Sequence, residues 1–426
     1  MDKLVRFAKS LFKRKSSHGS EEPKQRPWEI PYTNDFTVNL ENSFAVNMFT
    51  ALTASSRVND ENLAVCPCAV QVVLTAILPI VDEQVRLGLT NILCPNGRSL
   101  DDLQASLDTA STNGALNMVN AVFYNDTYQL LSLRKENLSA DNDNRYCPSG
   151  TLLTKMNYLA MSVQKIPEEG VNSAQSEDAD LVIREAATRR TPHLQLASIC
   201  QFTGAFERPL FHGGPRIFTC PGNVQKTVDF MVCKFTLGVR CHNVSVNREN
   251  AEPSDPQMII LNVEGRQSSV MLLLPPPDSG ETIGLLEERL TVERLLRWRE
   301  KSSELPLHIV FPKFRISCSI DLQPMLTAMG LGVLYDESAA ESVDHGLDAS
   351  ANGSLPISEF REQIVLDISE YGVATSAFKW NRLAPLIAGT GPDFVVDRPF
   401  LVIIWNEIAN VPLLIARVAD PASSLY

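Results

Sequence analysis

The sequence has no uninterrupted apolar run of the roughly 18 residues that a membrane-spanning helix requires, so it predicts no such segment. No C-x-x-C pair occurs either: Cys66 and Cys68 form only a C-x-C, and the six histidines show no ligand spacing. Structural zinc sites usually contain pairs of closely spaced cysteine or histidine ligands of that kind. We therefore expect no metal site and no bound cofactor.

The motifs of the common enzyme classes are missing as well. The sequence contains no H-E-x-x-H, no G-x-S-x-G and no G-x-x-x-x-G-K-[ST]. Gly389-Thr390-Gly391 lacks the lysine of a phosphate-binding loop and is interpreted as flexible loop. A Ser-His-Asp arrangement depends on tertiary contacts and is left open by the sequence. We expect the chain not to be an enzyme.

Positive charge is in deficit. The chain has 38 Lys and Arg against 50 Asp and Glu, a formal net charge of -12. An acidic surface repels the phosphates of nucleic acids, so no nucleic-acid partner is expected. The composition is typical of a soluble monomer.

The nine cysteines do not form a recognisable disulfide framework at this chain length. Four of them lie within or beside apolar, strand-like runs: Cys66, Cys200, Cys233 and Cys318. Cysteine in such surroundings behaves as a small buried apolar residue, and that is how these four are interpreted.

Residues 1–35 differ from the rest of the chain. Lysines and arginines alternate there with apolar residues at helical spacing over residues 3–15, and a stretch rich in Ser, Glu, Pro and Lys follows. A basic amphipathic helix that touches an acidic membrane surface is one interpretation, and a disordered basic tail is the other. The uninterrupted apolar core of an ordinary signal peptide is missing.

The remainder, residues 36–426, is expected to be one α+β domain, because no Gly/Ser-rich linker divides it and 44% of the chain is hydrophobic. Helices are predicted over residues 42–53, 69–80, 100–107, 285–300 and 322–329. Strands are predicted over 62–65, 116–124, 194–202, 258–263, 269–274, 307–317, 364–368, 394–404 and 411–418. Residues 134–180 are polar and receive no assignment.

Residues 370–393 have no helical or strand period and many small residues. A structureless segment of that length inside a compact domain is usually functional or disordered. We therefore expect an exposed loop there, between two strongly apolar regions.

Several short motifs, in order along the chain, carry a resemblance to a known family. They are Asn42-Ser43-Phe44-Ala45, Val119-Asn120-Ala121-Val122-Phe123, Phe202-Thr203-Gly204-Ala205-Phe206, Phe311-Pro312-Lys313-Phe314, Asp397-Arg398-Pro399-Phe400 and Ala416-Arg417-Val418-Ala419-Asp420-Pro421. Together they resemble the serpin family from about residue 40 to residue 421. Residues 134–195 fit it least well.

The resemblance implies a fold of three β-sheets with about eight or nine helices and an exposed reactive-centre loop, here residues 370–393. In that family a serine protease cleaves the loop, which then inserts as a new strand into the main sheet and traps the enzyme. The native state is then metastable, because insertion completes a β-ladder and releases stored strain.

The start of the loop must be small to enter the sheet. The hinge residues implied by the resemblance are Glu370, Gly372, Val373, Ala374, Thr375, Ser376 and Ala377. Phe378, Lys379 and Trp380 oppose insertion. Side chains alternate across a strand, so Val373, Thr375, Ala377 and Lys379 would point inward, and burying an unpaired lysine costs several kcal/mol.

The chain also departs from the family at the shutter and breach positions, where the main sheet opens. Two serines are replaced by Cys66 and Ala69, an asparagine by Ser198, a tryptophan by Phe206 and a histidine by Glu362. A polar network of this kind stabilises only when every member is present. The substitutions indicate that small apolar or weakly polar groups have replaced it.

Two functions remain open. In the first, the chain inhibits a serine protease, and the cleaved bond lies within Leu383-Ala384-Pro385-Leu386-Ile387. The resemblance implies, through the family's usual spacing from Gly372, cleavage at Leu386–Ile387 and a chymotrypsin- or elastase-like target, with Arg382 and a trypsin-like target as the alternative. In the second, the chain is a non-inhibitory binding protein with the same fold.

Four N-x-S/T sequons make the chain a glycoprotein candidate: Asn125, Asn137, Asn243 and Asn352. They can be used only in the secretory pathway. The resemblance suggests an extracellular location, whereas the missing signal peptide leaves an intracellular one open.

Overall fold

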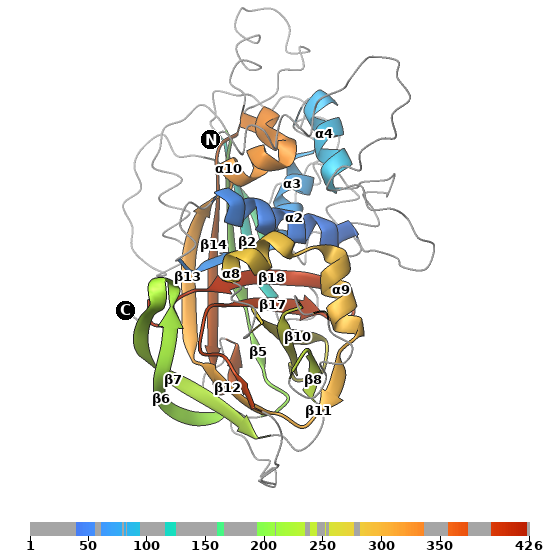
Figure 1. Cartoon of the computed structure of the whole chain (residues 1–426). Coiled ribbons are helices and arrows are strands. Elements are labelled where there is room, and N and C mark those ends of the chain that lie inside the picture. The colour runs from blue at the N-terminus through green and yellow to red at the C-terminus, as the bar shows by residue number, and fades with distance from the viewer. Residues whose placement is uncertain are drawn as a thin grey trace, which may run out of the picture.

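The computed structural model describes residues 40–55, 61–78, 81, 83–93, 116–124, 160–165, 194–208, 210–234, 239–244, 252, 255–276, 282–335, 357–373 and 393–423. Within them the chain is a mixed α+β structure with three β-sheets, as predicted (Figure 1). The basic extension 1–35 and the predicted helix 100–107 lie outside the described residues. The division into an extension and one domain thus stays a prediction, as does the number of helices.

The main sheet has the strand order β3-β2-β4-β14-β15-β5, with β13 paired to the other side of β14. Its strands are β2 (Leu116–Tyr124), β3 (Ala160–Lys165), β4 (Leu194–Phe202), β5 (Gly204–Ala205), β13 (Phe314–Asp321), β14 (Ile357–Ser369) and β15 (Gly372–Val373). The long strands β13 and β14 run side by side down the molecule, and β4 separates β14 from β2 (Figure 1). β14 is longer than the predicted 364–368, because its buried residues alternate with half-exposed ones along nearly its whole length.

The second sheet is the most apolar part of the core, with the order β1-β18-β17-β10-β9-β8-β11. Its strands are β1 (Leu63–Val65), β8 (Val239–His242), β9 (Gln257–Asn262), β10 (Ser268–Leu274), β11 (Ser303–Leu305), β17 (Phe400–Asn406) and β18 (Val411–Val418). Every residue of β10, β17 and β18 is buried. The predicted hairpin between β9 and β10 is confirmed, with Gly265 and Arg266 at positive φ in its turn.

The third sheet has the order β16-β12-β7-β6. Its strands are β6 (Phe211–Cys220), β7 (Val224–Lys234), β12 (His308–Pro312) and β16 (Asp393–Val395). A short 3-10 turn, Pro221–Asn223, connects β6 to β7. Since β16 pairs with β12, the chain that leaves the main sheet after β15 resumes in a different sheet.

The helices pack against the sheets. They are α2 (Leu40–Ser55), α3 (Pro67–Ile77), α4 (Glu83–Leu93), α8 (Ile283–Arg289), α9 (Val292–Glu300) and α10 (Gln323–Leu326). α10 continues through a π-helical turn, Thr327–Leu331, and a 3-10 turn, Gly332–Tyr335. All residues of α3 are buried, because it packs on β2 and β4 on one side and on β18 on another. Figure 1 shows α2 and α3 in front of the main sheet. In the described part of the chain, no helix combines the length and hydrophobicity that crossing a bilayer would require.

Three elements predicted as continuous are each divided into two in the structure. The helix 285–300 breaks at Leu290, whose backbone is extended, and α9 restarts with Thr291 as its N-cap, where the hydroxyl accepts from the Arg294 amide. The strand 307–317 divides at Lys313, whose amide donates to Asp229, so β12 and β13 join different sheets. The strand 394–404 divides between β16 and β17 at residues 396–399, where Pro399 has no amide to donate.

Several elements were not predicted, among them the helix α4 and the strands β3, β6, β7, β8 and β11, and one sequon is ruled out. β3 lies within the unassigned residues 134–180, and its register is set by a parallel ladder with β2 rather than by an apolar pattern of its own. The side chain of Asn243 is buried and donates to the backbone oxygen of Asp255. A glycan needs an exposed acceptor, so Asn243 cannot carry one in the folded chain.

Candidate functional site

The centre of the main sheet is a parallel ladder between β4 and β14, here called the seam. Residues Leu194 to Gln201 pair with Ile357 to Val365, and Ser198 lies opposite Glu362. β4 and β14 are far apart in the sequence, and no hairpin connects them.

One end of the seam is already occupied by a short third strand. After a turn at Glu370 and Tyr371, the chain reverses and β15 pairs antiparallel with β14, Val373 facing Ile368. On its other side β15 pairs with β5, Val373 facing Gly204 and Gly372 facing Ala205. These two hinge residues thus lie between β14 and the continuation of β4, and the Val373 side chain is fully buried.

Glycine is required at position 372. Its φ is +131°, and a Cβ added there would lie 2.1 Å from the backbone oxygen of Gly204 and 2.7 Å from the Cα of Ala205. Any side chain would push β15 away from β5, because backbone atoms cannot move aside as a flexible side chain can. The small residue expected at the hinge therefore has a steric reason.

The turn before β15 is held from both sides. The amides of Phe206 and Leu210 donate to the backbone oxygens of Tyr371 and Glu370, each at 3.3 Å. The Lys313 ammonium lies 3.1 Å from Glu370 Oε2. Partial burial works against ionisation of Glu370, but its own backbone amide and Lys313 outweigh it, so its pKa is lowered from the ordinary value.

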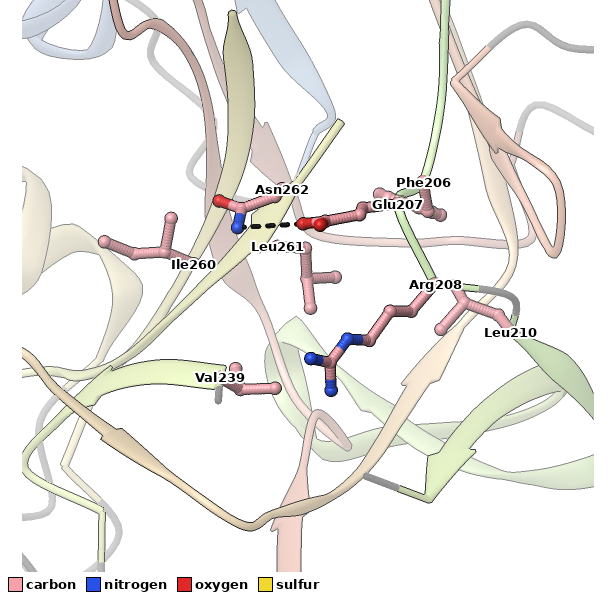
Figure 2. Close-up of a pocket in the computed structure, with 8 residues that line it drawn as sticks. All are labelled: Phe206, Glu207, Arg208, Leu210, Val239, Ile260, Leu261 and Asn262. Atoms are coloured by element: carbon pink, nitrogen blue, oxygen red, sulfur yellow. Dashed lines mark hydrogen bonds between the residues drawn. The ribbon is translucent and has the colours of Figure 1, made fainter. Parts of the chain in front are cut away.

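A pocket lies beside this turn (Figure 2). It is lined by Phe206, Glu207, Arg208, Leu210, Val239, Ile260, Leu261 and Asn262. Glu207 accepts hydrogen bonds from Asn262 at 3.2 Å and from the exposed Arg266 guanidinium at 2.8 Å, and the bonds from Arg266 lower its pKa. Phe206 is buried and forms an isolated bridge to Val263. No sequence motif marked Glu207 or Arg208.

The middle of the seam contains a buried polar cluster that joins three elements. Cys66, the N-cap residue of α3, donates its backbone amide to Glu362 Oε2 at 3.2 Å. Cys200 on β4 lies with its Sγ 3.8 Å from Glu362 Oε1 and 3.4 Å from Ser198 Oγ. Ala69, one turn into α3, is buried but contributes no polar atom to the cluster.

The side chains of this cluster are shielded from water. Burial raises the pKa of the Glu362 carboxyl well above its ordinary value, and the nearby Cys66 thiol raises it further. Burial likewise raises the pKa of Cys200. Both shifts favour the protonated groups. The interpretation of these positions as apolar or weakly polar missed the hydrogen-bonded carboxyl of Glu362 at their centre.

Cys200 was not predicted as a member of this site. Its i, i+2 spacing from Ser198 puts both side chains on one face of a strand, a signal that the sequence did contain. Most of the loop lies outside the described residues. This applies to the hinge residues 374–377, to Phe378, Lys379 and Trp380, to Arg382 and to the proposed cleavage region 383–387.

Comparison with known families gives one match over most of the chain. The model of the family described as "Serpin (serine protease inhibitor)" matches residues 39–421. Plasminogen activator inhibitor 2 from Homo sapiens is 29% identical over 157 residues, 36% of this chain and 37% of that protein. Antithrombin-III from Homo sapiens is 30% identical over 170 residues, 39% of this chain and 35% of that protein. The chain thus spans little more than a third of the length of these relatives.

Solved structures match over more of the chain. Native protease nexin-1 with heparin superposes with a TM-score of 0.66 at 17% identity, covering 90% of this chain and 100% of that one. Thyroxine-binding globulin in complex with thyroxine gives a TM-score of 0.64 at 17% identity, covering 90% and 99%. At this identity the likeness shows a shared fold.

Proposed function

The chain belongs to the serpin family, and from that premise we propose that it inhibits a serine protease through a cleavable loop that inserts into the seam. The observation that carries the proposal is β15. Its two residues, at the start of the loop, already pair with β14 and β5.

The direction of β15 suits further insertion. It runs antiparallel to β14, and β14 runs parallel to β4, so a strand that continued from Val373 would be antiparallel to both neighbours. Each inserted stretch would replace one parallel ladder with two antiparallel ladders, which are slightly more stable per residue. That exchange is the driving force we assign to the reaction.

Cleavage is needed because the loop is held at both ends. It begins in the main sheet at β15 and ends in the third sheet at β16, where Asp393 to Val395 pair with β12. Insertion along the length of the seam requires one of these ends to be released. We propose that the protease releases it by cutting between Leu386 and Ile387, with Arg382 as the alternative cleavage residue.

The target proposed from that bond is a chymotrypsin- or elastase-like enzyme. The names of two relatives, plasminogen activator inhibitor 2 and antithrombin-III, are consistent with inhibition. In this role the chain is a monomer that is consumed with its target, so it does not act as an enzyme.

A second candidate is a serpin-fold binding protein whose loop does not insert. Lys379 favours it, because the period-two pattern would turn that side chain inward on insertion and burying an unpaired lysine is costly. The thyroxine-binding globulin among the similar structures is named for binding a small molecule. Under this alternative the loop is cut as a substrate or is not cut at all.

Incubation with chymotrypsin, elastase and trypsin, followed by denaturing electrophoresis, tests the proposal. Inhibition predicts a complex that survives denaturation, a cleaved bond at residue 386 or 382 by mass spectrometry, and a raised melting temperature of the cleaved chain. Val373→Arg would put a charge at a buried position and should convert the chain into a substrate. Tyr371→Arg, at an exposed turn residue, is the matched control and should keep the complex. Cleavage without a complex and without a gain in melting temperature would favour the binding protein.

A further inference from the structure

The buried cluster in the seam has the composition of a metal-binding site. Cys66 Sγ, Cys200 Sγ and a carboxylate oxygen of Glu362 all lie within 4.8 Å of one another. All three residues are fully buried. They come from the first turn of α3, from β4 and from β14, so no sequence motif could have announced them.

The distances are close to those of a tetrahedral zinc centre. With Zn–S near 2.3 Å and Zn–O near 2.1 Å, two ligand atoms lie about 3.6–3.8 Å apart. The measured separation of Cys200 Sγ and Glu362 Oε1 is 3.8 Å. Since no pair in the cluster exceeds 4.8 Å, side-chain adjustments of about 1 Å would bring all three atoms into coordination.

The surroundings supply the remaining requirements. The Cys66 amide holds Glu362 Oε2 at 3.2 Å and so orients the carboxylate. Ser198 has a hydroxyl oxygen 3.4 Å from Cys200 Sγ. Asn120, opposite Ser198 on β2, is fully buried, and neither polar atom of its side chain has a hydrogen-bond partner among the described residues.

In the part of the chain that the structure describes, no cationic side chain pairs with the cluster. Within the described ranges, Glu362 forms no ion pair with a lysine, arginine or histidine. Its hydrogen-bond donors there are Cys66 and Cys200, and the Cys318 thiol also interacts with it electrostatically. A buried carboxyl next to two thiols is costly when ionised unless a positive charge accompanies it. A divalent cation would supply that charge where no side chain does.

We propose that Cys66, Cys200 and Glu362 bind one thiophilic divalent cation of the Zn²⁺ class. On binding, the two thiols and the carboxyl group release their protons to solvent, and no oxidant or reductant takes part. The three anionic ligands exceed the charge of the cation by one. The N-terminus of α3 lies beside them, where partial positive charge favours an anion.

The bound cation joins β4, β14 and α3 across the seam. It therefore stabilises the closed sheet by mass action, since the unfolded chain lacks the assembled site. Metal binding does not depend on protease inhibition, so it can be tested whether or not the chain is an inhibitor.

The test uses the full chain, refolded under reducing conditions with Co²⁺ or Zn²⁺ because the site is buried. The expected results are one equivalent of metal after gel filtration, the thiolate-to-cobalt charge-transfer and d–d absorption of a tetrahedral site, and a melting temperature that rises with Zn²⁺. Cys200→Ser and Glu362→Gln should each lower the affinity at least about tenfold, as even the loss of an outer partner can. Cys68→Ser and Cys233→Ser, at buried thiols outside the cluster, are the matched controls and should leave the stoichiometry and spectrum unchanged.

Several results would overturn the proposal. They are a folded wild-type chain with no tetrahedral cobalt spectrum, equal metal binding by wild type and Cys200→Ser, or a Cys66–Cys200 disulfide in protein isolated without reductant. If Cys200→Ser does not fold, the metal affinity of Glu362→Gln and the cobalt spectrum of the wild-type chain still test the proposal. A cobalt spectrum without thiolate bands would assign the metal to histidines elsewhere and would equally contradict the site.

Discussion

The rings of Phe314 and Phe400 meet edge to face, with centroids 5.6 Å apart and an interplanar angle of 77°. Phe314 opens β13 in the main sheet and Phe400 opens β17 in the second sheet, and both side chains are fully buried. The contact therefore packs the main sheet against the second sheet where β13 and β17 begin.

Replacing either ring by alanine should cost about 3–5 kcal/mol of unfolding free energy, because a large cavity opens in the core. Because the rings touch, the double variant should reveal a coupling energy of about 0.5–1.5 kcal/mol. Denaturant titration measures all three variants. Ile217→Ala, at an exposed position on β6, is the control and should change stability by less than about 0.5 kcal/mol. A loss below about 1 kcal/mol at Phe314 or Phe400 would contradict this packing.

Gly372→Ala should detach β15 from the main sheet. The new Cβ would collide with the backbone of Gly204 at 2.1 Å, so the hinge should move out of its place between β14 and β5. Hydrogen exchange at Val373 and proteolysis of the loop should both become faster. Gly265→Ala is the control. It also puts a side chain at a positive φ, but its Cβ would meet no atom within 4 Å, so it shows the effect of backbone strain without a steric clash. Unchanged exchange at Val373 in Gly372→Ala would rule out this role for the glycine.

The Glu370 turn predicts an acid-sensitive hinge. The pKa of Glu370 is lowered from its ordinary 4.5, so the folded state favours the ionised form. This stability is fully present above pH 4.5 and is lost as pH falls through the lowered folded-state pKa. In melting curves from neutral to acid pH, wild type should have a higher melting temperature than Glu370→Gln. This difference should shrink as the pH falls through the lowered pKa of Glu370. In a Lys313→Met background, which lacks the paired cation, the melting-temperature difference caused by Glu370→Gln should be smaller. Parallel curves for wild type and Glu370→Gln would refute the linkage.

Arg417 and Glu287 form a buried ion pair between β18 and α8. Arg417 Nη1 lies 3.0 Å and 3.2 Å from the two carboxylate oxygens. Arg417→Met should cost about 3–5 kcal/mol, because it leaves a buried carboxylate unpaired. Adding Glu287→Leu should recover part of the loss, so the double variant should be more stable than the sum of the single variants implies. Strict additivity in thermal or chemical unfolding would mean that the two charges do not interact.

If the loop inserts, Lys379 should slow the reaction. It falls on the inward side of the period-two pattern that begins at the buried Val373, whereas Phe378 falls on the outward side. Lys379→Ser should increase the fraction of protease trapped per loop cleaved, and Phe378→Ser should change that fraction less. Equal effects of the two substitutions on this fraction would argue against insertion in the proposed register.

Some elements whose signal is local were predicted well. β2 and β4 have the expected bounds, and the β9–β10 hairpin follows from apolar runs separated by Glu264-Gly265-Arg266. The single strand predicted over residues 307–317 is wrong for a tertiary reason. β12 and β13 form a nearly continuous apolar alternation, but Lys313 donates to Asp229 and the two halves pair with different sheets. Which partner a strand takes is not encoded in its own period.

The amino-acid sequence by itself determined the fold class and the family resemblance, because periodicity, turn residues and ordered motifs are properties of the chain alone. Only the tertiary structure decided that Cys66, Cys200 and Glu362 share one buried cluster, and that Gly372 and Val373 lie between β14 and β5. Both arrangements join segments far apart in the sequence. Their contacts depend on sheet order and register, which are fixed only when the whole core packs.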